Sequence, residues 1–334
     1  MILRKPSVYD RFRCIAAQCP DSCCKDWSVV VDPDAVSLYQ SLPGPLGQRL
    51  RQVLQEEDGD TVLTIENGRC PMWRTDGLCR IQAELGHDAL CKTCREFPRL
   101  THDYGDRMEI GLELSCPEAA RLLLTGEETV HTESDIPGGE APEYDSDAMS
   151  VLLRSRETAL SLLSDPRMTV PEALCALLLF GAHTQTELDG EEMPPFDPNA
   201  ALETVRQLAA IAQPNAAALL DFYAGLEILT ESWPARLAAP TQSPQWSEVH
   251  RRFAKLSVER YWLQSVSDYD LLCRVKMTVS GCILVYLLGG DPVQTVQQYS
   301  KEIDNNTDNV EAVLDGAYRS PALTDAQLLS LLLG

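Results

Sequence analysis

The feature that most constrains this chain is a concentration of cysteines in its amino-terminal third. Nine of the twelve cysteines come as a tight quartet, a spaced pair, a Cys-x-x-Cys and a last single residue: Cys14, Cys19, Cys23, Cys24, Cys70, Cys79, Cys91, Cys94 and Cys116. Thiolates at such spacings can reach one metal centre from turns and helix starts. The sequence therefore predicts an irregular Cys-rich metal-binding module, with these nine cysteines as candidate ligands.

Four interpretations of these cysteines remain open. The first two are an iron–sulfur cluster or similar iron site held by thiolates, and a structural zinc site. The others are disulfides, which a reducing compartment disfavours, and free thiols packed in a core. Nine cysteines so close together are hard to explain by packing, so we favour iron, then zinc. Three further cysteines lie in apolar helical runs and are predicted to be core residues: Cys175, Cys273 and Cys282.

The composition limits the cellular compartments and the classes of binding partner that suit this chain. The 334 residues carry a formal net charge of −22, of which residues 1–126 contribute −4 and the remainder −18. A field of that sign repels nucleic-acid phosphate and anionic membranes, and it attracts a basic partner. Met1–Pro6 is too short and broken for an export signal, and the apolar run Val279–Gly289 falls short of the ~20 residues that span a bilayer. We expect a cytoplasmic protein without nucleic-acid or membrane partners.

Hydrophobic periodicity predicts a mainly α fold in three parts. Residues 1–126 form the Cys-rich metal or iron–sulfur module, residues 127–147 an acidic linker without Lys or Arg, and residues 148–334 an α-helical domain. Helices are expected near 147–163, 169–184, 199–212, 215–230, 245–265, 268–288, 292–303, 307–318 and 323–332.

The Cys-rich part is expected to contain only short elements. Residues 1–32 look irregular, apart from a strand at 27–31, and a second strand is expected at 62–65. Asp34 is the expected cap of a helix that runs to about Gln55 and breaks at Pro43-Gly44. Further short helices are expected at 81–90 and, capped by Ser115, from there to about residue 125.

These residues resemble the flagellin lysine N-methylase family and, more distantly, the zinc- or iron-chelating families with Cys-Cys motifs. The match covers about residues 8–126, and beyond residue 147 there is only a helical tail of suitable length. It is carried by residues 12–27, Arg69-Cys70-Pro71, residues 77–81, Leu85-Gly86, residues 90–99 and residues 114–121. The resemblance implies methyl transfer from S-adenosylmethionine to lysines of flagellin and a [4Fe-4S] cluster needed for activity, ligated by some of the nine cysteines.

That reaction requires a neutral lysine amine, so a carboxylate or tyrosine must take its proton. The candidate bases are Tyr104, Glu109, Glu113 and Glu118, although a surface or capping role is the simpler interpretation of each. Two histidines near the Cys-x-x-Cys, His87 and His102, are weaker candidates for metal ligands.

The donor pocket has no visible sequence signature, because no glycine-rich strand–loop–helix fingerprint is present. Trp27 and Trp73 are candidate pocket walls or core residues. The carboxylate of a methionine moiety suits arginine, and the candidates are Arg95, Arg99 and Arg121. Catalytic and cofactor-binding residues are otherwise left unassigned.

Three functions compete on this reading. The first is a cluster-dependent protein-lysine N-methyltransferase. The second is a non-catalytic zinc- or iron-binding module that binds a partner protein through an acidic helical body. The third is an iron-handling protein whose thiols carry the metal as cargo.

Overall fold

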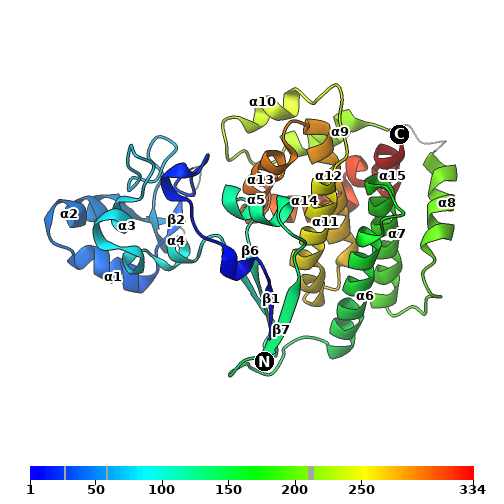
Figure 1. Ribbon diagram of the computed structural model, residues 1–334, viewed down its shortest axis with the longest axis horizontal. Coiled ribbons are helices and arrows are strands. Elements are labelled where there is room, and N and C mark those ends of the chain that lie inside the picture. Colours follow the sequence, from blue (N-terminus) through cyan, green and yellow to red (C-terminus); the bar gives the residue numbers. More distant parts are fainter. Residues whose placement is uncertain (26–27, 58, 210–213) are drawn as a thin grey trace. The chain divides into compact units, whose positions relative to one another are not determined.

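The computed structural model describes residues 1–25, 28–57, 59–209 and 214–334, and these divide into two compact units (Figure 1). Unit 1 contains residues 1–103 and 107–138, and unit 2 contains residues 104–106 and 139–334. Helices predominate across the described residues, which confirms the mainly α prediction. The strands of the described residues all lie in unit 1, in two sheets that the sequence pattern largely missed.

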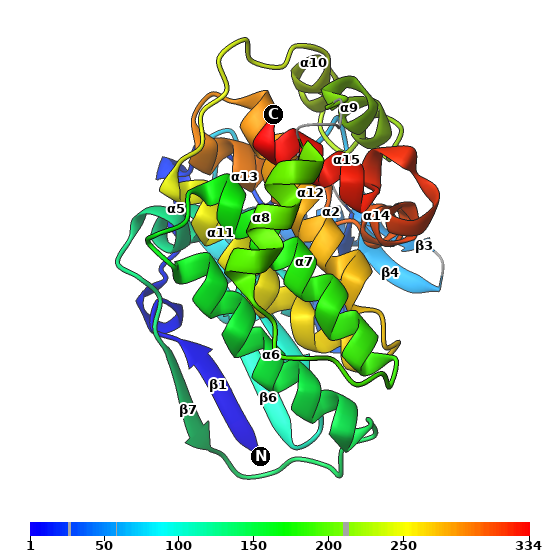
Figure 2. The same ribbon diagram turned by 90° about the vertical axis from the view of Figure 1, so that its right-hand side faces the viewer.

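A four-stranded sheet in unit 1 has the strand order β5-β6-β1-β7. Its strands are β1 (Ile2–Pro6), β5 (Arg99–Asp103), β6 (Arg107–Leu112) and β7 (His131–Asp135). Figure 2 shows β7, β1 and β6 side by side, with β1 parallel to β6 and antiparallel to β7. The irregular assignment of residues 1–32 is therefore wrong at β1, and residues 131–135 form a strand within the expected linker. β7 is almost entirely polar and exposed, so backbone pairing alone defines it and no apolar alternation marks it.

A three-stranded antiparallel sheet has the order β2-β4-β3, from β2 (Val29–Val30), β3 (Leu54–Glu57) and β4 (Asp60–Leu63). The strand expected at 27–31 is confirmed at Val29–Val30, while Trp27 lies outside the described residues. The strand expected at 62–65 is present but starts two residues earlier.

Two helices, α1 (Pro33–Ser41) and α2 (Gly44–Val53), occupy the region where one broken helix was expected, and the break at Pro43-Gly44 is confirmed. The helix cap is Asp32 rather than Asp34, because Asp32 has extended backbone angles and its side chain accepts a hydrogen bond from Ala35 N (3.1 Å). Proline at the first helical position then favours a start at Pro33.

Short helices present the second half of the cysteines. They are α3 (Arg80–Leu85), the 3-10 turn η3 (His87–Ala89), α4 (Lys92–Glu96) and α5 (Pro117–Thr125). The helix expected at 81–90 is thus interrupted at Gly86, whose positive φ of 89° ends α3. Cys116, not Ser115, is the N-cap of α5. Two further 3-10 turns, η1 (Tyr9–Arg11) and η2 (Ala16–Gln18), lie between β1 and β2.

The regular secondary structure of unit 2 consists of helices in its described residues, as expected. Its helices are α6 (Ser146–Ser164), α7 (Val170–Leu188), α8 (Pro198–Ala209), α9 (Ala216–Ala224), α10 (Trp233–Ala238), α11 (Glu248–Tyr261), α12 (Leu271–Leu288), α13 (Pro292–Glu302), α14 (Thr307–Arg319) and α15 (Asp325–Leu333), with 3-10 turns η4 (Trp262–Val266) and η5 (Pro321–Leu323). The helix expected at 215–230 ends early, and α10 was not expected. The end of the helix expected at 199–212 lies outside the described residues.

Helix α12 forms the centre of unit 2, with α7, α11, α13, α14 and α15 packed around it (Figure 1). By length and composition α12 qualifies as a membrane span, but 83% of that window is buried inside the structure. Its apolar surface is therefore used for packing between helices. Cys175, Cys273 and Cys282 are all buried here, as expected, and burial raises the pKa of Cys175 and of Cys273 to about 12.

Candidate thiol site

Five of the nine amino-terminal cysteines pack in one hydrophobic cluster of unit 1. Cys70 and Cys91 are buried in it, and Cys24, Cys79 and Cys94 are partly buried against it. The cluster is built on α1, α2 and the three-stranded sheet, with Tyr39, Leu50 and Leu63 among its fully buried members. The fold therefore gathers cysteines from three separate stretches of sequence in one hydrophobic cluster.

Backbone pairing holds these stretches together. Cys70 N donates a hydrogen bond to Cys24 O (2.6 Å), which joins the quartet to the spaced pair. Within the spaced pair, Arg80 N donates to Met72 O (2.7 Å), and Trp73 and Cys79 form an antiparallel bridge. Turns, rather than long strands or helices, therefore fix the position of these thiols.

Three cysteines occupy the N-cap positions of short helices: Cys79 before α3, Cys91 before α4 and Cys116 before α5. First-turn N–H groups have no acceptor within the helix, so a thiolate at the N-cap is stabilised by them. At Cys79 and Cys116 burial outweighs this effect, and it raises the pKa of both thiols, that of Cys116 to about 11. Metal coordination replaces the lost hydration of a buried thiolate, so buried N-cap cysteines suit a thiolate-ligated ion.

The Cys-x-x-Cys forms a coupled pair at the start of α4. A hydrogen bond from the Cys94 thiol lowers the pKa of Cys91 to about 7, and the N–H of Cys94 also favours the Cys91 thiolate. The same contact, together with burial, raises the pKa of Cys94. Cys91 is therefore the cysteine of this pair that deprotonates first.

Two side chains on other elements, and one within the segment itself, hold the Cys-x-x-Cys in place. The Asp32 carboxylate accepts hydrogen bonds from Ala35 N (3.1 Å) and Lys92 N (2.6 Å), so one residue caps α1 and α4. Tyr39 donates to Ala89 O (2.9 Å), and Thr93 donates to Val30 O (2.9 Å). Sequence inspection missed all three, although Asp32 directly before Pro33 carried a recognisable capping signal.

We expect Asp32→Ala to loosen the start of α4 by about 1 kcal/mol, the usual effect of losing a helix cap. The hydrogen bond from Lys92 N is the main reason why the pKa of Asp32 lies below its usual value. Because the folded pKa is lowered, this stabilisation is present above about pH 4 and is lost as the pH falls through the folded pKa. Hydrogen exchange of peptides covering residues 90–94 should therefore differ between wild type and variant at neutral pH and converge in acid. A difference that stays unchanged at the lowest pH at which both proteins remain folded would contradict this origin.

The other four cysteines are Cys14, Cys19, Cys23 and Cys116. Cys14 and Cys23 are exposed, and Cys14 accepts a hydrogen bond from Ala16 N (3.4 Å). Negative charge on Cys19 and Cys23 contributes to raising the pKa of Cys116, and Cys23 has the same effect on Cys70 and Cys79. The charge on Cys23 therefore acts both on thiols of the hydrophobic cluster, Cys70 and Cys79, and on Cys116 outside it.

The gathered thiols do not form a closed coordination site in the structure. Within residues 1–25, 28–57, 59–209 and 214–334, no group of three or more Cys, His, Asp or Glu side chains is arranged to hold a metal ion. The adjacent pair Cys23-Cys24 illustrates why: one member is exposed and the other packs against the core. The assignment of the nine cysteines as ligands therefore stays a prediction.

The histidine and base candidates are dispersed. His87 is exposed on η3, and His102 lies on β5 opposite Glu109 of β6. Glu109 is buried between Arg4 (3.9 Å) and Arg107 (3.4 Å). Three other candidates lie elsewhere: Glu118 pairs with Arg121 at the start of α5, Glu113 follows β6, and Tyr104 belongs to unit 2.

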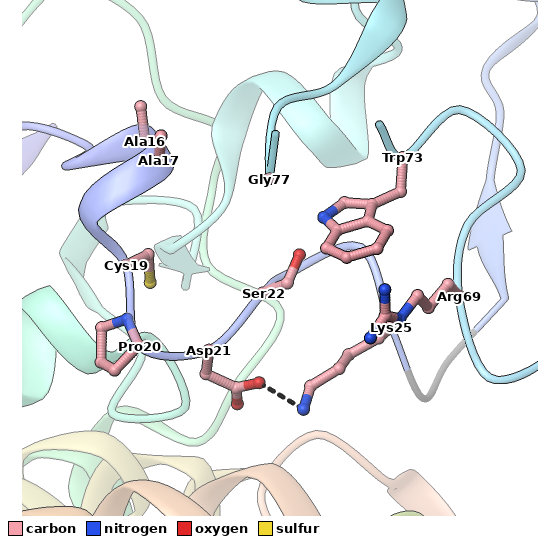
Figure 3. Close-up of a pocket in the computed structure, with 10 residues that line it drawn as sticks. All are labelled: Ala16, Ala17, Cys19, Pro20, Asp21, Ser22, Lys25, Arg69, Trp73 and Gly77. Carbon is pink, nitrogen blue, oxygen red and sulfur yellow. Dashed lines mark ion pairs between the residues drawn. The ribbon is translucent and has the colours of Figure 1, made fainter. Parts of the chain in front are cut away.

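The arginine candidates also have other contacts. Arg121 makes a double hydrogen bond to Glu118 (2.7 and 2.8 Å), and Arg99 lies 5.5 Å from the ring centres of Tyr9 and Phe12. Among the described residues, the side chain of Arg95 donates one hydrogen bond, to Leu90 O at 3.5 Å. A different arginine, Arg69, lines a cavity in unit 1 together with Trp73 and Cys19 (Figure 3). The suggested wall role of Trp73 is therefore supported, while Trp27 lies outside the described residues.

Comparison with known proteins identifies relatives for part of the chain. A lysine-N-methylase of Salmonella typhimurium strain LT2 is 33% identical over 127 residues, and one of Salmonella choleraesuis strain SC-B67 is 32% identical over 127 residues. The flagellar biosynthetic protein FliU of Salmonella muenchen is 32% identical over 127 residues. Each match covers 36% of this chain; it spans 32% of either lysine-N-methylase and 75% of FliU. No family model and no solved structure matches this chain.

Proposed function

Because the chain belongs to the flagellin lysine N-methylase family, we propose that it is a protein-lysine N-methyltransferase that uses S-adenosylmethionine to methylate flagellin. The observation that carries the proposal is the similarity to FliU over three quarters of that protein, in a chain whose amino-terminal unit gathers thiols in one cluster. Two of the relatives are named for lysine methylation and the third for flagellar biosynthesis, which supports the reaction and the substrate class. The matched relatives account for about a third of the chain, so the role of unit 2 is part of the proposal.

We further propose that unit 1 holds a [4Fe-4S] cluster, with zinc as the alternative. The donor set fits such a centre chemically, because five thiols belong to one hydrophobic cluster of side chains. Two of these thiols are at the N-caps of helices, whose N–H groups favour thiolates. The ligands would come first from these five: Cys24, Cys70, Cys79, Cys91 and Cys94. When bound, the metal centre would cross-link the turns that carry the thiols.

The protein's own residues have identifiable tasks in this scheme. Asp32 and Tyr39 orient the Cys-x-x-Cys. The hydrophobic side chains packed around Tyr39 exclude water from Cys70 and Cys91. The excess of negative charge in residues 127–334 favours approach of a protein segment that presents lysine.

Mass spectrometry of flagellin tests the proposed reaction. Anaerobically purified protein incubated with S-adenosylmethionine and flagellin should add the mass of one or more methyl groups at lysine side chains. Omitting S-adenosylmethionine is the matched control, and flagellin whose lysines are already dimethylated should gain less. Unmodified flagellin after incubation with iron-loaded protein would disprove the activity and favour a non-catalytic binding role.

A further inference from the structure

We infer that the cavity lined by Cys19, Asp21, Lys25, Arg69 and Trp73 binds the α-amino-acid head group of the methyl donor. The inference rests on the proposed function, because a methyl donor of the sulfonium type carries a carboxylate and an ammonium on one carbon. The remaining lining residues are Ala16, Ala17, Pro20, Ser22 and Gly77, most of them small. All of the lining residues belong to unit 1.

Arg69 and Trp73 provide the carboxylate-binding side of this cavity. The Arg69 guanidinium carbon lies 3.7 Å from the centre of the Trp73 ring, so the group lies over the face of the indole. Stacking fixes the plane of the guanidinium and leaves its edge to donate two parallel hydrogen bonds, the geometry that carboxylates prefer. Among the described residues, Arg69 has no carboxylate partner, and the structure gives its side chain only the contact with Trp73.

The indole N–H of Trp73 adds a second donor. Its Nε1 atom is buried and has no hydrogen-bond partner among the described residues. Figure 3 shows the nitrogen edge of the indole directed towards Ser22, on the cavity side, while Arg69 lies against the ring face. A buried donor without a partner costs free energy, and a bound oxyanion would satisfy it.

Asp21 and Lys25 give the cavity both signs of charge. Lys25 Nζ lies 2.7 Å from Asp21 Oδ1 (Figure 3), and both residues line the cavity together with Arg69 and Trp73. A carboxylate accepts up to about four hydrogen bonds, so pairing with Lys25 does not exhaust Asp21 as an acceptor for an ammonium group. Two cations, one anion and an indole donor together match a zwitterion better than a simple anion or cation.

The size of the cavity favours a head group over a whole nucleoside. Its volume is about 180 Å³, below the range of about 300–1,000 Å³ that pockets for drug-sized ligands occupy. The donor would therefore place its amino-acid end here and extend the rest beyond the cavity. The candidate thiols lie close by in the chain: Cys19 lines the cavity, and an antiparallel bridge joins Lys25, which follows Cys24, to Arg69, which precedes Cys70.

Calorimetric titration of the anaerobic full-length protein tests this assignment. The probes are S-adenosylhomocysteine, which carries the head group, and 5′-methylthioadenosine, which lacks it. Arg69→Gln is expected to weaken binding of S-adenosylhomocysteine about 10- to 100-fold, because a hydrogen bond to a charged group is lost. The affinity for 5′-methylthioadenosine should be unchanged, and Arg69→Lys should lie between wild type and Arg69→Gln.

Arg74→Gln is the matched control, because it removes the same charge from a nearby arginine that pairs with Asp76 (2.6 Å) outside the cavity. Equal binding of S-adenosylhomocysteine by wild type and Arg69→Gln, or equal losses for both probes, would overturn the assignment. If wild type then still methylates flagellin, only the pocket is wrong and the proposed function stands. If wild type neither methylates flagellin nor binds S-adenosylhomocysteine, the function fails and the pocket assignment falls with it. Arg69-dependent binding without methylation would support the pocket and disprove the flagellin reaction.

Discussion

Alanine at Cys91 or Cys94 is expected to remove the bound metal and to abolish lysine methylation together. Both thiols belong to the buried cluster that contains Cys70, and the Cys94 thiol already favours the thiolate form of Cys91. Loss of one thiolate from a four-ligand site leaves an incomplete coordination shell, and the free energy of metal binding also stabilises the fold around it. Elemental analysis and visible absorption of anaerobically purified variants measure the metal, and mass spectrometry of flagellin measures the activity.

Cys175→Ala is the control for these variants, because Cys175 is buried in α7 of unit 2 and is not among the candidate ligands. It should retain both metal and activity. Variants at Cys91 or Cys94 that lose iron and still methylate would show that the centre has no catalytic role. Variants that keep a full complement of metal would remove this pair from the ligand set. A colourless wild type that carries zinc would replace iron with the alternative metal.

Tyr39→Ala is expected to destabilise unit 1 by about 3–5 kcal/mol, the usual cost of truncating a buried aromatic side chain. Tyr39 is 0% exposed, and its hydroxyl donates to Ala89 O (2.9 Å) in the segment that leads into Cys91. The variant therefore loses packing around the thiols and the bond that holds this segment against α1. Hydrogen exchange of peptides from α1 and α2 reports the loss of stability, and the affinity for added iron or zinc should fall in parallel.

One variant separates packing from hydrogen bonding at Tyr39, and a second, at a neighbouring exposed residue, is its control. Tyr39→Phe keeps the ring and should cost about 0.5–1.5 kcal/mol, the net contribution of one hydrogen bond. Leu38→Ala changes a residue of the same helix that is 38% exposed and should have a much smaller effect than Tyr39→Ala. Equal protection of α1 in wild type and Tyr39→Ala would show that the cluster does not depend on this ring.

Much of the fold was predictable from local sequence. The helices of unit 2 follow apolar spacing and capping residues, as in α7, where Thr169 and Glu172 form a capping box. The break before Gly44 was also visible, because proline and glycine restrict or release the backbone locally. The strands β1 and β7 were not predictable, because β7 is polar and is defined by its pairing with β1.

The sequence by itself determined which residues can act as soft metal donors, and that they are concentrated in one third of the chain. The tertiary structure decided which of these thiols share a cluster, that Asp32 and Tyr39 support them, and that Arg69 rather than Arg95, Arg99 or Arg121 stacks on a tryptophan beside a cavity. The ability of a thiol to bind a metal is a property of the single side chain, so it can be recognised from the sequence residue by residue. Proximity, burial and pairing arise only when segments distant in sequence are packed together, so no local pattern encodes them.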